Sequence, residues 1–130
     1  MNDYDSYLLL SRESSLKTET AENILKGMNK CISDIRSEDK KEYYIDMLKK
    51  AFRYTSIRCE WELMSRNEMI ENDSLRTAYH NDFITSLNIL ARLAANEGID
   101  SSWRESLGDN RKRIGDFACY ITYITGISNR

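Results

Sequence analysis

Residues 28–97 read MNKCISDIRSEDKKEYYIDMLKKAFRYTSIRCEWELMSRNEMIENDSLRTAYHNDFITSLNILARLAANE and contain neither glycine nor proline. A sheet protein needs a turn about every 8–12 residues, and turns draw heavily on these two residue types. A stretch of this length without either one therefore favours helices. The 130-residue chain as a whole has five glycines and no proline, with 41% hydrophobic and 31% charged residues. This composition is typical of a folded globular domain and excludes a disordered chain.

Apolar residues recur at helical spacing along most of the chain and predict an all-α fold. We expect a four-helix bundle with a short extra helix before the last helix, folded as a single domain over residues 1–130. The long helices are predicted at about 18–36, 38–70, 75–96 and 110–125, and the short one at 102–107. Gly98 and Gly108 are expected to end helices, and Ser37, Ser102 and Asp109 to begin them. Residues 1–17 are predicted to form a short helix or an ordered arm.

The second predicted helix carries two apolar stripes instead of one. Tyr44, Leu48, Ala51, Phe52, Thr55 and Cys59 form the stripe that we assign to the core. A helix reaching residue 70 would span about 50 Å, whereas a globule of this size is about 36 Å across. The helix therefore breaks, near residues 55–56 or 65–67, or it overhangs and a partner covers it. The second stripe then predicts a homodimer interface, whose candidate residues are Tyr43, Tyr54, Ile57, Trp61 and Met64.

The net charge and the cysteines of the chain indicate which binding partners and which cellular compartment to expect. The net charge of −2 argues against a dedicated nucleic-acid or anionic-membrane binder, which usually shows a basic excess. The longest uncharged run, residues 117–129, is too short to span a bilayer. Three scattered cysteines without paired spacing indicate reduced thiols. We therefore expect a cytoplasmic protein with no membrane partner.

The single histidine, His80, excludes several kinds of metal chemistry. Di-metal helical bundles use two Glu-x-x-His motifs, and zinc sites need clustered histidines and cysteines. No motif selects a nucleophilic cysteine, and none points to a cofactor. We expect no catalytic residue and no metal ligand, with His80 as a hydrogen-bonded structural residue.

Arg76 and His80 lie one helical turn apart and suggest a further alternative. Small helical-bundle ribonucleases of toxin–antitoxin and phage-defence systems carry an arginine and a histidine separated by four to six residues on one helix, and the chain resembles them here. The resemblance implies action at a scissile phosphate. Three residues separate the pair in this chain, which is one fewer than in that pattern.

The segment 102–118 supports another alternative, a helix-turn-helix nucleic-acid binder. Trp103, Leu107, Gly108, Ile114 and Phe117 resemble the spacing of that motif, with a glycine at the turn. The start of the second helix would then contact nucleic acid, through Asn110, Arg111, Lys112 and Arg113. The simpler interpretation is an ordinary corner of the bundle, whose basic residues are solvated or paired with Asp109 and Asp116.

The C-terminal part of the chain resembles a family of short bacterial helical proteins of unknown function. The residues that carry this resemblance lie mainly within 75–130: YHNDFI at 79–84, LNILAR at 87–92, WR at 103–104 and RKRIGDFA at 111–118. The resemblance implies a bacterial, cytoplasmic helical protein and no site residues. We therefore expect a non-enzymatic protein–protein interaction module that acts as a homodimer.

Overall fold

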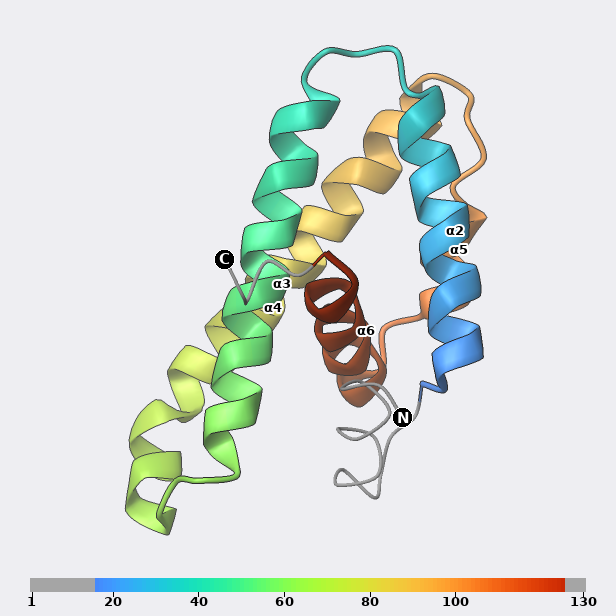
Figure 1. Cartoon of the computed structure of the whole chain (residues 1–130). Coiled ribbons are helices and arrows are strands. Elements are labelled where there is room, and N and C mark those ends of the chain that lie inside the picture. Colours follow the sequence, from blue (N-terminus) through green and yellow to red (C-terminus); the bar gives the residue numbers. More distant parts are fainter. Residues whose placement is uncertain (1–15, 126–130) are drawn as a thin grey trace.

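The computed structural model describes residues 16–125, which fold into helices without any strand (Figure 1). The all-α class is thereby confirmed. Of the predicted N-terminal arm, residues 1–15 lie outside the described residues. The helices are α2 (Thr18–Asp34), α3 (Lys40–Trp61), α4 (Arg66–Asn96), α5 (Ser102–Leu107) and α6 (Arg111–Thr125).

The helices pack around α6. The antiparallel pair α3 and α4 lies on one side of it, and α2 lies on the other side against α5 (Figure 1). Nine consecutive residues of α6, 114–122, are buried. The stripe of α2 enters the core as predicted, with Ile24, Met28 and Cys31 buried. The last helix of the chain is thus the centre of the core.

The turn between α3 and α4 corrects two predictions. The second helix ends at Trp61 and not near residue 70, so that only the breakpoint at residues 65–67 is confirmed. Ser65 and Glu68 form a capping box, in which Ser65 Oγ accepts a hydrogen bond from the Glu68 amide at 3.2 Å. The expected interruption at residues 72–74 is absent, and α4 runs through it. A serine followed three residues later by a glutamate is a signal for a helix start. Our prediction placed the start of this helix near residue 75, too far along the chain.

The two positive-φ glycines end helices as predicted. After α4, the Gly98 amide bonds to the Ala95 carbonyl and the Ile99 amide bonds to the Ala94 carbonyl. Together these two backbone hydrogen bonds form a Schellman motif. Gly108 follows α5 with φ 76° and ψ −167°, a region that is open almost only to glycine.

Three predicted helix starts differ in detail from the structure. Ser102 is the first residue of α5 and not its cap; Ser101 holds the N-cap position without a side-chain cap bond, and Asp100 Oδ1 accepts from the Ser102 amide at 3.0 Å. Asn110, not Asp109, caps α6, because Asn110 Oδ1 accepts from the Arg113 amide at 3.1 Å. Ser37 precedes the regular start of α3, and its Oγ accepts from the Asp39 amide. In each case the accepting side chain lies one to three residues before the first residue of the helix.

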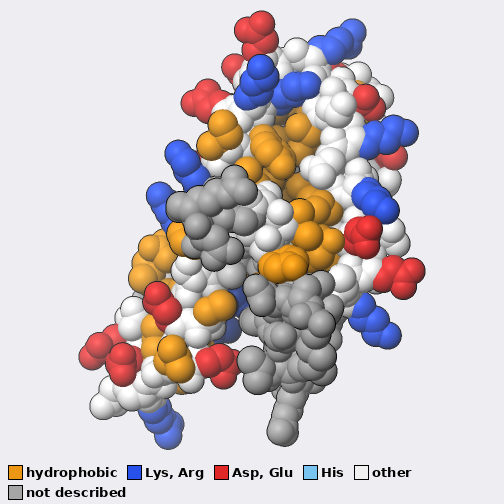
Figure 2. All heavy atoms as spheres, in the orientation of Figure 1, with side chains coloured by type: hydrophobic (Ala, Val, Ile, Leu, Met, Phe, Trp, Pro, Cys, Tyr) orange, Lys and Arg blue, Asp and Glu red, His pale blue; other side chains and the backbone are white. Residues whose placement is uncertain are grey.

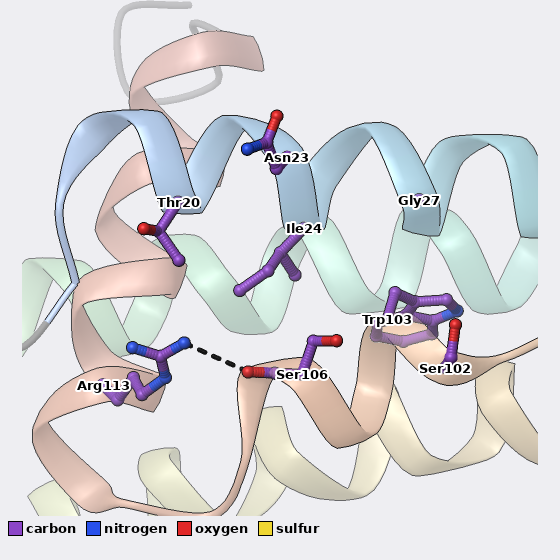
Figure 3. A pocket seen from close by; sticks show the side chains of 8 residues that line it. All are labelled: Thr20, Asn23, Ile24, Gly27, Ser102, Trp103, Ser106 and Arg113. Atoms are coloured by element: carbon purple, nitrogen blue, oxygen red, sulfur yellow. Dashed lines mark hydrogen bonds between the residues drawn. The ribbon is translucent and has the colours of Figure 1, made fainter.

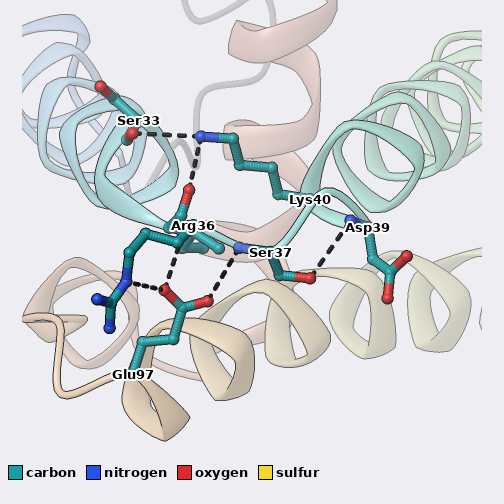
Figure 4. Close-up of polar contacts among 7 residues, drawn as sticks. Ser33, Arg36, Ser37, Asp39, Lys40 and Glu97 are labelled. Atoms are coloured by element: carbon teal, nitrogen blue, oxygen red, sulfur yellow. Dashed lines mark hydrogen bonds and ion pairs between the residues drawn. The ribbon is translucent and has the colours of Figure 1, made fainter.

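Glu97, at the end of α4, holds the connection between α2 and α3 (Figure 4). Its carboxylate accepts from the Arg36 amide at 2.8 Å and from the Ser37 amide at 3.2 Å. Lys40 Nζ donates to the carbonyls of Ser33 and Ile35 at the end of α2. The Arg36 contacts hold the pKa of the Glu97 carboxyl below its usual value. One side chain thereby ties together the ends of two helices that are distant in sequence.

Candidate functional site

The structure corrects the predicted interface on α3. Tyr54 and Ile57 are buried in the core of the chain itself, and Tyr54 is only 1% exposed. Neither can form the centre of an exposed interface. Tyr43, Trp61 and Met64 are half-buried, and the Arg76 guanidinium covers the Trp61 ring, with its carbon 4.5 Å from the ring centroid.

The stripe that we assigned to the core is only partly buried: Ala51 is fully buried and Leu48 packs against the core, but two other members of the stripe reach the surface of α3. Phe52 is 38% exposed and Cys59 is also exposed. Ile45, seven residues before Phe52, is 51% exposed. Residues seven apart lie on nearly the same face of a helix. We call Ile45, Phe52 and Cys59 the outer stripe.

Away from the centre of the core, α3 and α4 extend together as a protruding arm whose base contacts α6 (Figure 1). We define the arm as residues 58–79. No residue in this range is buried. Leu63 is 88% exposed, and Ile70 and Leu75 are also exposed. Figure 2 shows hydrophobic side chains at the surface of this part, next to acidic ones.

Several residues of the helix-turn-helix alternative are buried or form hydrogen bonds within the fold. A recognition helix must present one face to the major groove, but α6 is buried on all sides over residues 114–122. Arg113 Nε donates to the Leu107 carbonyl at 2.8 Å, and Arg113 Nη2 donates to the Ser106 carbonyl. Asn110 caps α6, and Arg111 and Lys112 are exposed.

The two acidic residues beside this basic run form ion pairs with arginines from outside it. Asp109 pairs with Arg104 at 2.6 Å. Asp116, which is only 1% exposed, pairs with Arg58 of α3 at 3.3 Å. Next to Asp116, a Cβ on Gly115 would lie 2.5 Å from the Arg58 guanidinium. The glycine therefore provides the space in which this buried ion pair forms.

A basic cluster surrounds His80, next to the Arg58–Asp116 pair. His80 is 9% exposed and packs edge-on against Tyr54, with 5.4 Å between the ring centroids. Arg58 lies 5.7 Å from the centroid of the same tyrosine. Arg76 lies one turn before His80 on α4, and Arg111 Nη2 donates to Thr77 Oγ1 at 3.1 Å. Burial lowers the pKa of His80, and the charges of Arg111, Arg58 and Arg76 lower it further.

The predicted pair Arg76 and His80 is therefore brought together, but the structure adds Arg58 and Arg111. These two arginines come from α3 and α6. No sequence pattern indicated Arg58, and the sequence pointed to Arg111 only as a candidate nucleic-acid contact. His80 Nδ1 lies 3.1 Å from Asn81 Oδ1. His80 Nε2 and Arg76 Nε are buried and have no hydrogen-bond partner in the structure.

A shallow pocket of about 470 Å³ lies between α2, α5 and the start of α6 (Figure 3). Its floor is close to Gly27, where a Cβ would lie 3.3 Å from Trp103 Cβ. Arg113 reaches its edge, but the guanidinium is bonded to main-chain carbonyls. The lining offers hydroxyl and amide groups from Thr20, Asn23, Ser102 and Ser106.

The three thiols lie within residues 16–125, and burial disfavours their reactive form. Burial raises the pKa of Cys31 and Cys59, and that of Cys119 to about 12, which disfavours the reactive thiolate. No group of three or more histidines, cysteines and acidic residues in this range is arranged to hold a metal ion. None of the helices within it is both long and apolar enough to cross a membrane.

Comparison of the chain with protein-family models, curated proteins and solved structures gave no match in any of the three.

Proposed function

We propose that this chain is a non-enzymatic protein–protein interaction module that forms a homodimer through the outer stripe of α3. The observation that carries this proposal is the exposure of Ile45, Phe52 and Cys59 at seven-residue spacing. Two helices that carry such a stripe bury it by packing along each other. A two-fold axis covers both stripes with a single contact, and it is the commonest symmetry of homo-oligomers.

The charges beside the outer stripe favour an antiparallel arrangement. Lys49 and Arg53 flank Phe52, whereas Glu60 and Glu62 follow Cys59. Antiparallel pairing that sets Phe52 across from Cys59 brings the basic part of one helix to the acidic part of the other. Parallel pairing would instead place like charges side by side, which costs stability. The half-buried Ser56 lies between the two stripe residues and is small enough for close approach.

In this proposal the four longer helices form one bundle that presents α3, and α5 is a connection within it. We place the dimer in the bacterial cytoplasm, because an exposed free thiol such as Cys59 is typical of a reducing compartment.

Sedimentation at micromolar concentration tests the dimer. We expect the wild-type chain to sediment at twice its mass of 15.2 kDa, and Ile45→Asp combined with Phe52→Asp to sediment as a monomer. Ile124→Asp on α6 is the matched control, because Ile124 is 50% exposed but lies off the stripe. The control should remain a dimer. A wild-type chain that sediments as a monomer would refute the homodimer.

Oxidative cross-linking tests the orientation. In the antiparallel dimer two Cys59 residues lie about 10 Å apart along the axis, too far for a disulfide. A Phe52→Cys variant places a thiol across from Cys59 of the partner. We expect this variant, but not the wild type, to form a covalent dimer under mild oxidation. A cross-linked wild type would indicate parallel helices.

A further inference from the structure

Four side chains from three helices meet at the base of the arm, away from the outer stripe. They are Arg58 of α3, Arg76 and His80 of α4, and Arg111 of α6. Tyr54 links two of them, since it contacts both Arg58 and the His80 ring. Arg111 reaches α4 at Thr77, which lies between Arg76 and His80. The fold therefore concentrates positive charge around one buried imidazole.

This positive charge is only partly neutralised. Asp116 pairs with Arg58, but neither Arg76 nor Arg111 forms an ion pair with any residue of the range 16–125. Arg76 instead covers the Trp61 ring, and Arg111 bonds to a neutral hydroxyl. Two guanidinium groups are thus available to an anion. Arg111 is exposed and Arg76 is half-buried, so both can reach a ligand at the surface.

Two buried polar atoms in the same cluster have no hydrogen-bond partner among residues 16–125. Arg76 Nε is a donor that finds no acceptor in the structure. His80 Nδ1 lies against Asn81 Oδ1, an oxygen that only accepts, so Nδ1 carries the proton in the neutral ring. Nε2 then holds a lone pair and becomes a donor only when the ring is protonated. Buried donors without acceptors are rare in folded proteins. An anion would supply the acceptor that Arg76 Nε lacks, and it would also accept from Nε2 once the ring is protonated.

We propose that Arg76, Arg111 and His80, with Arg58 behind them, form a binding site for a phosphate group. A phosphate has several acceptor oxygens and up to two negative charges, which match two guanidinium groups and a protonated imidazole. Arginine suits this ligand because its planar fork donates two parallel hydrogen bonds. The phosphate is either inorganic phosphate or the phosphomonoester of a small molecule such as a nucleoside monophosphate.

Phosphate binding is expected to be coupled to proton uptake from solvent. Without the ligand, burial and the three arginines keep His80 neutral near pH 7, because they lower its pKa below the ordinary 6.5. A bound anion opposes these arginines and favours the imidazolium, so the pKa of His80 rises in the complex. By linkage, phosphate binds more tightly as the pH falls through that raised pKa.

Nuclear magnetic resonance can follow this site directly, because His80 is the only histidine of the chain. The pKa of its imidazole is measured in sodium phosphate and in sodium chloride at equal ionic strength. We expect phosphate to raise this pKa by about one unit. Titration with adenosine monophosphate then identifies the source, since tighter binding than that of inorganic phosphate indicates a nucleotide ligand and equal binding indicates phosphate alone.

Two variants and one control decide whether the cluster is the site. Arg111→Gln changes an exposed residue and should abolish most of the phosphate-induced shift without unfolding the chain, and Arg76→Gln should do the same. Arg92→Gln is the control, because Arg92 is an exposed arginine farther along α4; it should retain the full shift. The proposal is overturned if phosphate leaves the wild-type pKa unchanged, or if both Arg111→Gln and Arg76→Gln shift as the wild type does.

Discussion

The centre of α6 and the arm are both helical, but they are stabilised in different ways. Residues 114–122 of α6 are buried without exception, whereas no residue of the arm, 58–79, is buried. Burial of apolar side chains keeps α6 helical. Apart from the contacts of Arg58 and Thr77 with α6 at its base, the arm depends on its own helix-helix contact and on local signals such as the capping box at Ser65. Helices without tertiary support are marginal in water, so we expect the arm to open locally while the core stays folded.

The largest expected effect comes from truncating a side chain of α6. Phe117 is fully buried at the centre of the core, and Phe117→Ala leaves a cavity there. We expect the free energy of unfolding to fall by about 3–5 kcal/mol, as measured by urea denaturation. A loss below about 1 kcal/mol would mean that α6 is not the centre of the core.

The second effect concerns the ion pair that joins the base of the arm to α6. Arg58→Met leaves the buried Asp116 carboxylate without its guanidinium partner, and we expect a loss of about 3–5 kcal/mol. Adding Asp116→Leu to this variant should recover most of the loss, because apolar replacement of a whole buried pair is often neutral. No recovery in the double variant would show that the loss has another cause.

Two helix caps of similar geometry provide a matched comparison. Asn110 caps α6 at 3.1 Å and Ser65 caps α4 in the arm at 3.2 Å. Asn110→Ala should lower the global free energy of unfolding by about 1 kcal/mol. Ser65→Ala should instead speed hydrogen exchange in residues 66–75 and leave exchange in α6 nearly unchanged. Equal effects of both changes on α6 would show that arm and core unfold together.

The smallest effect is expected at the tip of the arm. Leu63 is 88% exposed, and Leu63→Ala should change the free energy of unfolding by less than about 0.5 kcal/mol. Thermal denaturation at low protein concentration is the appropriate measurement. A loss above about 1 kcal/mol would indicate that something covers the tip in solution.

The sequence allowed the helical class to be predicted. The core face of α2 was also predictable, because this helix has a single apolar stripe and no second apolar face competes with it. Both stripes of α3 are apolar, so the pattern alone could not determine which of their residues face inward. Packing against α6 decides it: Thr55 bonds to Thr122 and Arg58 pairs with Asp116. Tyr54 therefore faces inward together with Ala51 of the predicted core stripe. Phe52 of that stripe stays at the surface, contrary to our prediction.

The exact starts of helices also could not be determined from the sequence pattern alone. Asp109 and Asn110 are adjacent, and either side chain can cap a helix. Arg104 binds Asp109 at 2.6 Å, and Asn110 is the residue that caps α6. The start signal at Ser65, in contrast, was present in the sequence, since Glu68 follows at the spacing of a capping box.

The candidate phosphate site was predictable only in part. Arg76 and His80 are one turn apart on a single helix, so their proximity follows from helical periodicity. Arg58 and Arg111 come from distant segments, and no local pattern indicates that they join this pair. Only the packing of α3, α4 and α6 makes the four residues a cluster.

The length of α4 also has a mechanical consequence. Its 31 residues form a rod of about 46 Å, anchored at one end by the Glu97 contacts to Arg36 and Ser37. The other end carries the tip of the arm. A tilt of the rod by about 5° around Glu97 would displace Ile70 by about 3.5 Å, given a lever of about 40 Å. Small changes at the anchor are therefore magnified at the tip.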